Sequence, residues 1–200
     1  MRSLRVAKSQ DKQTMEFHEN TIYHIYNQGN NKQQIFFKED NYRYFLGKMK
    51  TFMTPYGEFL AYCLMPNHFH FLFYVRTISI TQNNGIDRTL NDSIGIMLRS
   101  YTSAINRQEK RSGSLFRKKT KAKDGSEEDV ITLEGKNKGL FFRGKMDYAH
   151  FCVDYIHKNP VKAKLVFKPE EWKYSSAREF VGQEKSTLCN LEFVKELGLG

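Results

Sequence analysis

The sequence predicts an α+β domain in which an antiparallel sheet carries helices on one face, with further helices toward the C-terminal end. In the first half of the chain, two stretches have apolar residues at helical spacing, and three stretches are rich in aromatic and β-branched residues. Apolar residues make up 40% of the 200 residues, which is enough to bury a core. No internal repeat is visible, so one domain explains the length.

The first part of the chain alternates between strand and helix. Residues 21–27 have strand composition, and the polar residues 28–31 that follow have the composition of a turn. Residues 39–53 carry apolar side chains at helical spacing, and Pro55 and Gly57 end this pattern.

A hairpin and a second helix follow. Residues 58–65 and 68–75 have the composition of two strands, and the Pro-Asn pair between them makes a tight connection. Residues 76–87 are polar and loop-like, and residues 90–105 return to helical spacing. Residues 114–123 are a possible last strand, which would complete a β-α-β-β-α-β order, the ferredoxin-like arrangement.

The C-terminal part adds helices. Residues 147–158 have helical spacing, and Pro160 indicates that this helix ends at or before Asn159, or bends there. Residues 175–180 are a further short helical piece. We expect Trp172 to anchor the preceding loop to the core.

Composition divides the chain into three parts. Residues 1–20 are interpreted as a flexible basic arm, residues 21–182 as the domain and residues 183–200 as a C-terminal tail. Within the domain, residues 121–139 are rich in glycine and charge and are interpreted as an insertion or mobile loop. Residues 1–20 contain no apolar segment of the kind that export signals have, the sequence has no run of 18 apolar residues, and its three cysteines are widely spaced. We therefore expect reduced thiols, a cytoplasmic location and no membrane partner.

The charge balance indicates a polyanionic partner. The formal net charge is +10, and the chain contains 11 tyrosines and 16 phenylalanines. Basic chains rich in aromatic residues often bind nucleic acids. An ordinary basic protein would have the same charge, so charge alone does not decide.

Two histidines, His68 and His70, flank Phe69 in the second strand of the predicted hairpin. Alternate side chains of a strand point to the same face, so these two lie roughly 6–7 Å apart at Cα. Together they are able to hold one divalent metal ion. The alternative is a pair of surface histidines on an amphipathic strand.

A second pair lies on the predicted C-terminal helix. Tyr155 and Asn159 are four residues apart and so face the same side of a helix. The amide oxygen of Asn159 suits Mg²⁺ or Mn²⁺, and the phenol of Tyr155 is able to act as a nucleophile. The alternative is an interfacial aromatic residue and a helix cap.

A cationic segment lies between these two pairs. Its basic side chains would hold a phosphate backbone, and its aromatic residue would stack on a base. A solvated strand edge is the alternative. The candidate DNA-binding residues are Arg117, Lys118, Lys119, Lys121, Lys123 and Phe116.

The ordered set of motifs resembles the single-strand DNA transposases of the HUH superfamily that use one tyrosine, in particular the REP-associated tyrosine transposases. The resemblance covers about residues 21–180. Its main motifs are residues 65–70 (Met-Pro-Asn-His-Phe-His) and 153–162 (Val-Asp-Tyr-Ile-His-Lys-Asn-Pro-Val-Lys), supported by residues 23–31, 113–117 and 172–176.

This resemblance implies a transposase-like catalytic domain over residues 21–182. His68, His70 and Asn159 would bind Mg²⁺ or Mn²⁺, and Tyr155 would attack a phosphodiester in hairpin-bearing single-stranded DNA. The products would be a 5′-phosphotyrosine and a free 3′-OH, which reverses the reaction when DNA is rejoined. The choice between a monomer and a homodimer stays open.

Two rival functions remain. One is a domesticated protein that binds single-stranded DNA or RNA hairpins without mobilising DNA. The other is a metal-dependent hydrolase that uses water, which would need a carboxylate beside the metal as base. Asp154 is next to Tyr155 in sequence but points about 100° away on a helix.

Overall fold

The computed structural model describes residues 16–124 and 144–200. Most of the predicted N-terminal arm, residues 1–15, lies outside the described residues. The same is true of residues 125–139 of the predicted insertion and of the apolar segment 140–142.

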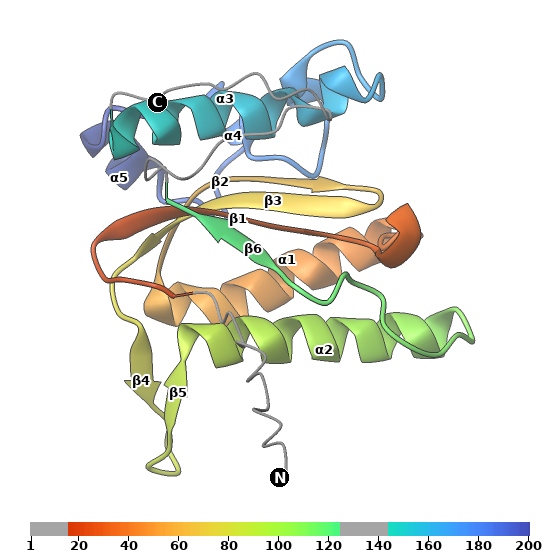
Figure 1. Cartoon of the computed structure of the whole chain (residues 1–200). Coiled ribbons are helices and arrows are strands. Elements are labelled where there is room, and N and C mark those ends of the chain that lie inside the picture. Colours follow the sequence, from red (N-terminus) through yellow and green to blue (C-terminus); the bar gives the residue numbers. More distant parts are fainter. Residues whose placement is uncertain (1–15, 125–143) are drawn as a thin grey trace, which may run out of the picture.

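A four-stranded antiparallel sheet forms the middle layer (Figure 1). Its strands are β1 (Thr21–Gln28), β2 (Gly57–Met65), β3 (His68–Val75) and β6 (Lys121–Lys123), in the order β2-β3-β1-β6. The two central strands pair along their whole length, with Tyr26 opposite His70 and Gln28 opposite His68. This confirms the prediction of an α+β domain with an antiparallel sheet.

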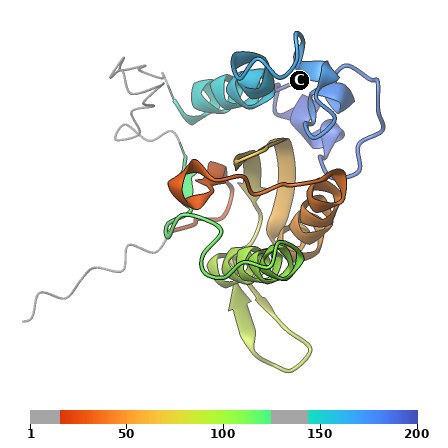
Figure 2. The same ribbon diagram turned by 90° about the vertical axis from the view of Figure 1, so that its right-hand side faces the viewer.

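Helices cover both faces of this sheet (Figures 1 and 2). The helices α1 (Glu39–Met53) and α2 (Leu90–Gln108) pack side by side on one face. The helix α3 (Lys145–Lys162) crosses the other face and packs on the three long strands. Two short C-terminal helices lie on the same side as α3, namely α4 (Ala177–Phe180) and α5 (Leu191–Glu196).

Strand β3 separates two hydrophobic clusters because its side chains alternate between the two faces. Phe69, Phe71 and Phe73 are fully buried on the α1 and α2 side. Leu72 belongs to the second cluster, which α3 covers. His68 and His70 share the parity of Leu72, so they face α3.

The remaining elements are short. The 3-10 turns are η1 (Asn30–Lys32), η2 (Thr54–Tyr56) and η3 (Pro169–Glu171). The stretch predicted as loop at residues 76–87 contains β4 (Ser79–Thr81) and the start of β5 (Asp87–Thr89), which form a separate hairpin. Three-residue strands are too short to give an alternating pattern in sequence, so the loop prediction was wrong there.

The helix α3 differs from its predicted end. It continues through Pro160 to Lys162, whereas the sequence predicted a stop or bend near Asn159. Pro160 has no N–H to donate, yet the last turn is completed by hydrogen bonds from Ala163 N to Asn159 O (3.0 Å) and from Leu165 N to Pro160 O (3.0 Å). Asn159 is therefore held inside a regular helix.

The segment after η3 covers the outer edge of β2. Leu64 N donates to Tyr174 O (2.8 Å), and Ser176 N donates to Tyr62 O (3.0 Å). Farther along the chain, the predicted C-terminal tail packs on the face of the sheet that α3 covers. Its residues Val194 and Leu199 are buried in the second cluster.

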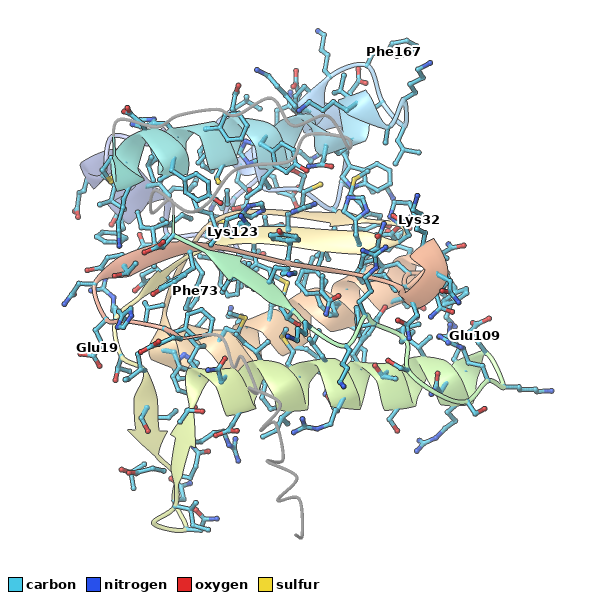
Figure 3. The ribbon with its side chains drawn as sticks, viewed as in Figure 1. Glu19, Lys32, Phe73, Glu109, Lys123 and Phe167 are labelled. Carbon is cyan, nitrogen blue, oxygen red and sulfur yellow. The ribbon has the colours of Figure 1, made fainter. Side chains whose placement is uncertain are left out.

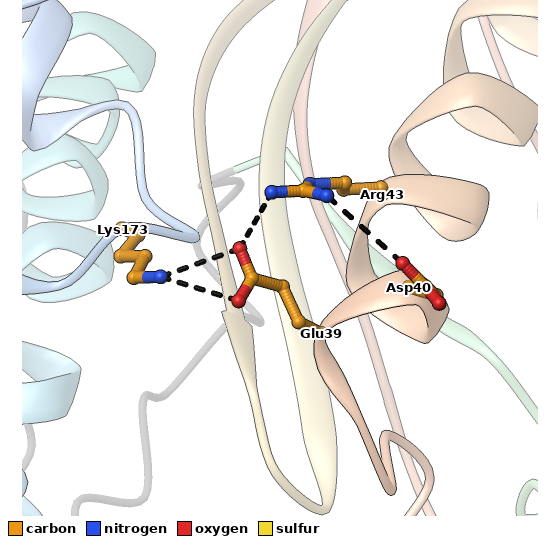
Figure 4. A network of polar contacts seen from close by, with 4 residues as sticks. All are labelled: Glu39, Asp40, Arg43 and Lys173. Carbon is orange, nitrogen blue, oxygen red and sulfur yellow. Dashed lines mark hydrogen bonds and ion pairs between the residues drawn. The ribbon is translucent and has the colours of Figure 1, made fainter.

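Trp172 anchors this segment, as predicted. Its indole Nε1 donates to Leu64 O (2.9 Å), and the ring packs against both clusters. The neighbouring Lys173 instead pairs with Glu39 of α1 at 3.3 Å, within an exposed network that includes Arg43 and Asp40 (Figure 4).

We expect Trp172→Phe to lower the free energy of unfolding by about 1–3 kcal/mol, because Leu64 O is buried and loses its donor. Lys173→Met should change it by less than about 1 kcal/mol, since exposed ion pairs contribute little. Urea unfolding of both variants measures this difference. Equal destabilisation would contradict the anchoring role of Trp172.

Candidate active site

Two histidines of β3 lie next to each other beneath α3. His68 is the first residue of the strand, and His70 is buried. Their ring centroids are 5.0 Å apart, with the ring planes nearly perpendicular. His70 is 7% exposed, and His68 is half-buried at the end of the strand.

Each of the two histidines has a hydrogen-bond partner for its Nδ1 atom. Nδ1 of His68 lies 2.6 Å from Oδ1 of Asn67, so the tautomer of neutral His68 that carries its proton on Nδ1 donates to this oxygen. Nδ1 of His70 lies 2.9 Å from Nε2 of His24 on β1. If both histidines donate through Nδ1, Nε2 of both ligand candidates keeps a lone pair.

Burial keeps these imidazoles neutral. Desolvation lowers the pKa of His68, and it lowers the pKa of His70 well below its usual value, helped by the neighbouring His24 and His68. It also lowers the pKa of His24 to about 3, with a smaller contribution from Lys123. Neutral imidazole is the form that binds metal ions.

The helix α3 brings Tyr155 and Asn159 to the same place. Oδ1 of Asn159 lies 3.4 Å from Nε2 of His68, while its Nδ2 donates to Tyr155 O (3.1 Å). The ring of Tyr155 lies 5.4 Å from that of His70, edge to face. Nζ of Lys162 lies 4.8 Å from the centre of the tyrosine ring.

His68, His70 and Tyr155 line a cleft of about 400 Å³, whereas Asn159 lies beside it, within 3.4 Å of His68. Among the described residues, no acidic side chain lines this cleft. Three cations of the predicted DNA-binding segment also line the cleft. These cations are Arg117, Lys119 and Lys121. A phosphodiester would therefore meet positive charge beside the tyrosine and the two histidines.

The other predicted DNA-binding residues lie elsewhere. Lys123 is on β6 (Figure 3), and its charge acts on His24. Lys118 lines a second cavity on the α2 side. Phe116 differs from the expectation of an exposed stacking residue: it is 5% exposed and packs on Phe69. Its aromatic character serves the core at this position.

The donor set fits a divalent ion bound by nitrogen and amide oxygen. The described residues contain no group of three or more His, Cys, Asp or Glu side chains placed to hold a metal, so Asn159 would have to supply the third ligand. In the same part of the chain, Asp154 points away and pairs with Lys158, with its side chain 67% exposed. Two imidazoles whose Nδ1 atoms are already hydrogen-bonded are typical of metal sites.

Sequence reasoning missed His24 and Asn67. His24 contacts His70 because of the register in which β1 and β3 pair. The residue pattern of one strand does not specify which strand it pairs with, or in which register. Asn67 directly precedes His68, so its contribution was available from the sequence.

The comparisons with known proteins give a fold relationship. No family model and no curated protein matches the chain. A solved structure of a REP-associated tyrosine transposase bound to a REP hairpin is similar, with a TM-score of 0.57 and 15% sequence identity. The match covers 88% of this chain and 94% of that one, so the similarity of fold extends over most of both chains. Among the described residues, no helix is long and apolar enough to cross a membrane.

We expect the protein to lose stability as the pH falls from about 6.5 toward 4. The pKa of buried His157, bonded to Ser176 Oγ at 2.8 Å, is lowered by desolvation to about 4, so the unfolded chain takes up a proton that the native state does not. Its contribution is complete above pH 6.5 and decreases by up to about 1.4 kcal/mol per pH unit below it.

Urea unfolding between pH 7.5 and 5 measures this effect, with His157→Gln as the control. The variant should show a shallower pH dependence than the wild type. Parallel curves for the two proteins would contradict the assignment.

Proposed function

We propose that this protein is a transposase-like DNA strand-transferase that cleaves and rejoins single-stranded, hairpin-bearing DNA through a 5′-phosphotyrosine intermediate. The proposal rests on one observation: Tyr155, His68 and His70 line the same cleft, together with three cationic side chains. The similar solved structure holds a hairpin, which supports a DNA hairpin as the partner of this chain.

Tyr155 is the proposed nucleophile. Its phenol oxygen attacks phosphorus and forms a P–O bond, while the bond from phosphorus to the 3′-oxygen breaks. The phenol releases one proton and the leaving 3′-oxygen takes one up, so no water is consumed and the phosphodiester energy is kept. Attack by a 3′-OH on the phosphotyrosine then reverses the exchange and joins the DNA.

The residues proposed to bind a divalent ion, Mg²⁺ or Mn²⁺, are His68, His70 and Asn159. When bound there, such an ion would supply Lewis-acid polarisation of a phosphate oxygen. The protein's own contribution is rigidity, because the histidines sit on a central strand and Asn159 sits within a helical turn that hydrogen-bonds back to Tyr155 O.

The cations of the cleft bind substrate. Arg117, Lys119 and Lys121 would contact phosphates on either side of the bond that breaks, and Lys162 stands over the tyrosine ring. We further infer that the sheet is a ferredoxin-like one, extended by the C-terminal helices, because its strand order and its β-α-β-β-α-β sequence agree with that arrangement.

A domesticated hairpin-binding protein is the main rival. Binding alone would have no use for a tyrosine placed beside two neutral histidines and an amide oxygen. A hydrolase that uses water would need a carboxylate base, and none lines the cleft in the described part of the chain.

The wild type should form a covalent adduct with labelled single-stranded hairpin DNA in the presence of Mg²⁺ or Mn²⁺, and Tyr155→Phe should abolish it. The phenylalanine keeps the ring but removes the oxygen that attacks. A denaturing gel detects the adduct, with DNA taken from the flanks of the protein's own gene.

His68→Ala is the companion variant, because it should lose cleavage while hairpin binding stays largely intact. Binding by the wild type without any adduct would favour the domesticated binder. A cleaved product with a free 5′-phosphate that persists in Tyr155→Phe would indicate water as the nucleophile.

We also expect His24→Leu to weaken Mn²⁺ binding by about 10–100-fold, because it removes the hydrogen bond that orients His70. His24→Gln retains an acceptor for Nδ1 of His70 and should recover much of that loss. Calorimetric titration with Mn²⁺ tests both variants. Identical affinities for wild type and His24→Leu would remove His24 from the site.

A further inference from the structure

The cleft shares its basic wall with a second cavity. Residues 117–120, which we call the basic loop, project between the bridge that pairs Phe116 with Gly29 and the start of β6. Arg117 and Lys119 line the cleft, and Arg117, Lys118 and Thr120 line the second cavity. The basic loop therefore borders both cavities.

Asn27 holds the basic loop in place. It is 4% exposed, and its Nδ2 donates to Arg117 O (3.2 Å) and to Thr120 Oγ1 (2.9 Å). Its Oδ1 accepts from Gln28 N (2.7 Å), and Gln28 O accepts from Arg117 N (2.8 Å). Both ends of the basic loop are thus tied to β1, which sets the position of its cations relative to the cleft.

The second cavity, which we call the α2 groove, has a volume of about 600 Å³. The side of α2 that carries Gly95 and Arg99 lines this groove. Gly95 has no side chain, and the guanidinium of Arg99 lies close above it: a Cβ added at Gly95 would be 3.0 Å from Nη1 of Arg99. Pockets of this size hold drug-sized ligands, and a nucleotide is of that size.

The lining of the α2 groove suits a nucleic acid strand. Arg99, Arg117 and Lys118 supply positive charge, and no acidic side chain from residues 16–124 or 144–200 lines the groove. Hydroxyl and amide groups from α2, among them Thr102 and Ser103, supply hydrogen bonds for base edges. By contrast, a cavity of similar volume beside α4 and α5 is lined by Glu179 and Glu184 together with Lys185 and Lys195, so it has no excess of positive charge.

We propose that the α2 groove binds unpaired nucleotides next to the scissile phosphodiester, so that one DNA strand passes over the basic loop from the groove into the cleft. Arg117 contacts the strand at the crossing, because it lines both cavities. This inference rests on the proposed function for the identity of the strand. It adds a subsite for single-stranded DNA outside the cleft that the tyrosine lines.

Binding of three labelled hairpins tests the proposal: one without a flank, one with six unpaired nucleotides on the 5′ side, and one with six on the 3′ side. Tyr155→Phe is the background, so that no adduct forms. One of the two flanks should raise the affinity about tenfold at moderate salt, and Arg99→Glu should remove most of that gain. The hairpin without a flank should bind with the same affinity to Tyr155→Phe and to the double variant that also carries Arg99→Glu.

Arg107→Glu is the matched control, because Arg107 is exposed on the same helix and does not line the groove. It makes the same charge change and should keep the gain from the flank. Gly95→Leu fills part of the groove without changing charge, and it should reduce the gain as Arg99→Glu does. Equal losses for Arg99→Glu and Arg107→Glu on all three hairpins would overturn the proposal.

Photocrosslinking separates this inference from the proposed catalysis. A 4-thiothymidine in the effective flank should attach to peptides from α2 or the basic loop, and attachment only to peptides from other parts of the chain would overturn it. If the wild type forms no adduct with any hairpin, the strand-transferase proposal fails. The flank-dependent binding and the crosslinks then still decide whether the groove holds single-stranded DNA.

Discussion

The alternation of side chains along β3 is the constraint on which the rest of the structure depends. One set of alternate residues, Phe69, Phe71 and Phe73, is buried against α1 and α2, and the other set begins with His68 and His70. A shift of one residue in pairing would put the histidines into the aromatic core and the phenylalanines under α3. Because the phenylalanines are fully buried, hydrophobic burial itself fixes the orientation of the histidines.

The candidate site combines a neutral centre with a charged border. Burial keeps His24, His68 and His70 neutral, while the cations of the basic loop and β6 stand at the rim, where water solvates them. A phosphodiester would be attracted by the rim and would meet uncharged nitrogen and oxygen donors inside. This division avoids burying several positive charges together, which desolvation makes costly.

Much of the fold was predictable because its main elements have long, regular patterns. The helix at residues 39–53 was predicted with the limits that α1 shows, and the hairpin of β2 and β3 followed from composition. The pairing of β1 with β3 and the place of α3 could not be read in this way, because they depend on contacts between distant residues. Phe116 illustrates the limit: its neighbours in sequence are cations, yet it is buried beside Phe69.

The segment that follows η3 has a consequence for assembly. The backbones of Tyr174 and Ser176 form hydrogen bonds with the outer edge of β2. Ser175, which lies between them in the sequence, forms an isolated antiparallel β-bridge with Cys63. Exposed sheet edges are sites where another chain adds a strand. A second copy that extended the sheet beyond β2 would first have to displace this segment, along with the anchor at Trp172. The protein thus protects one side of its sheet from edge-to-edge association by means of its own chain.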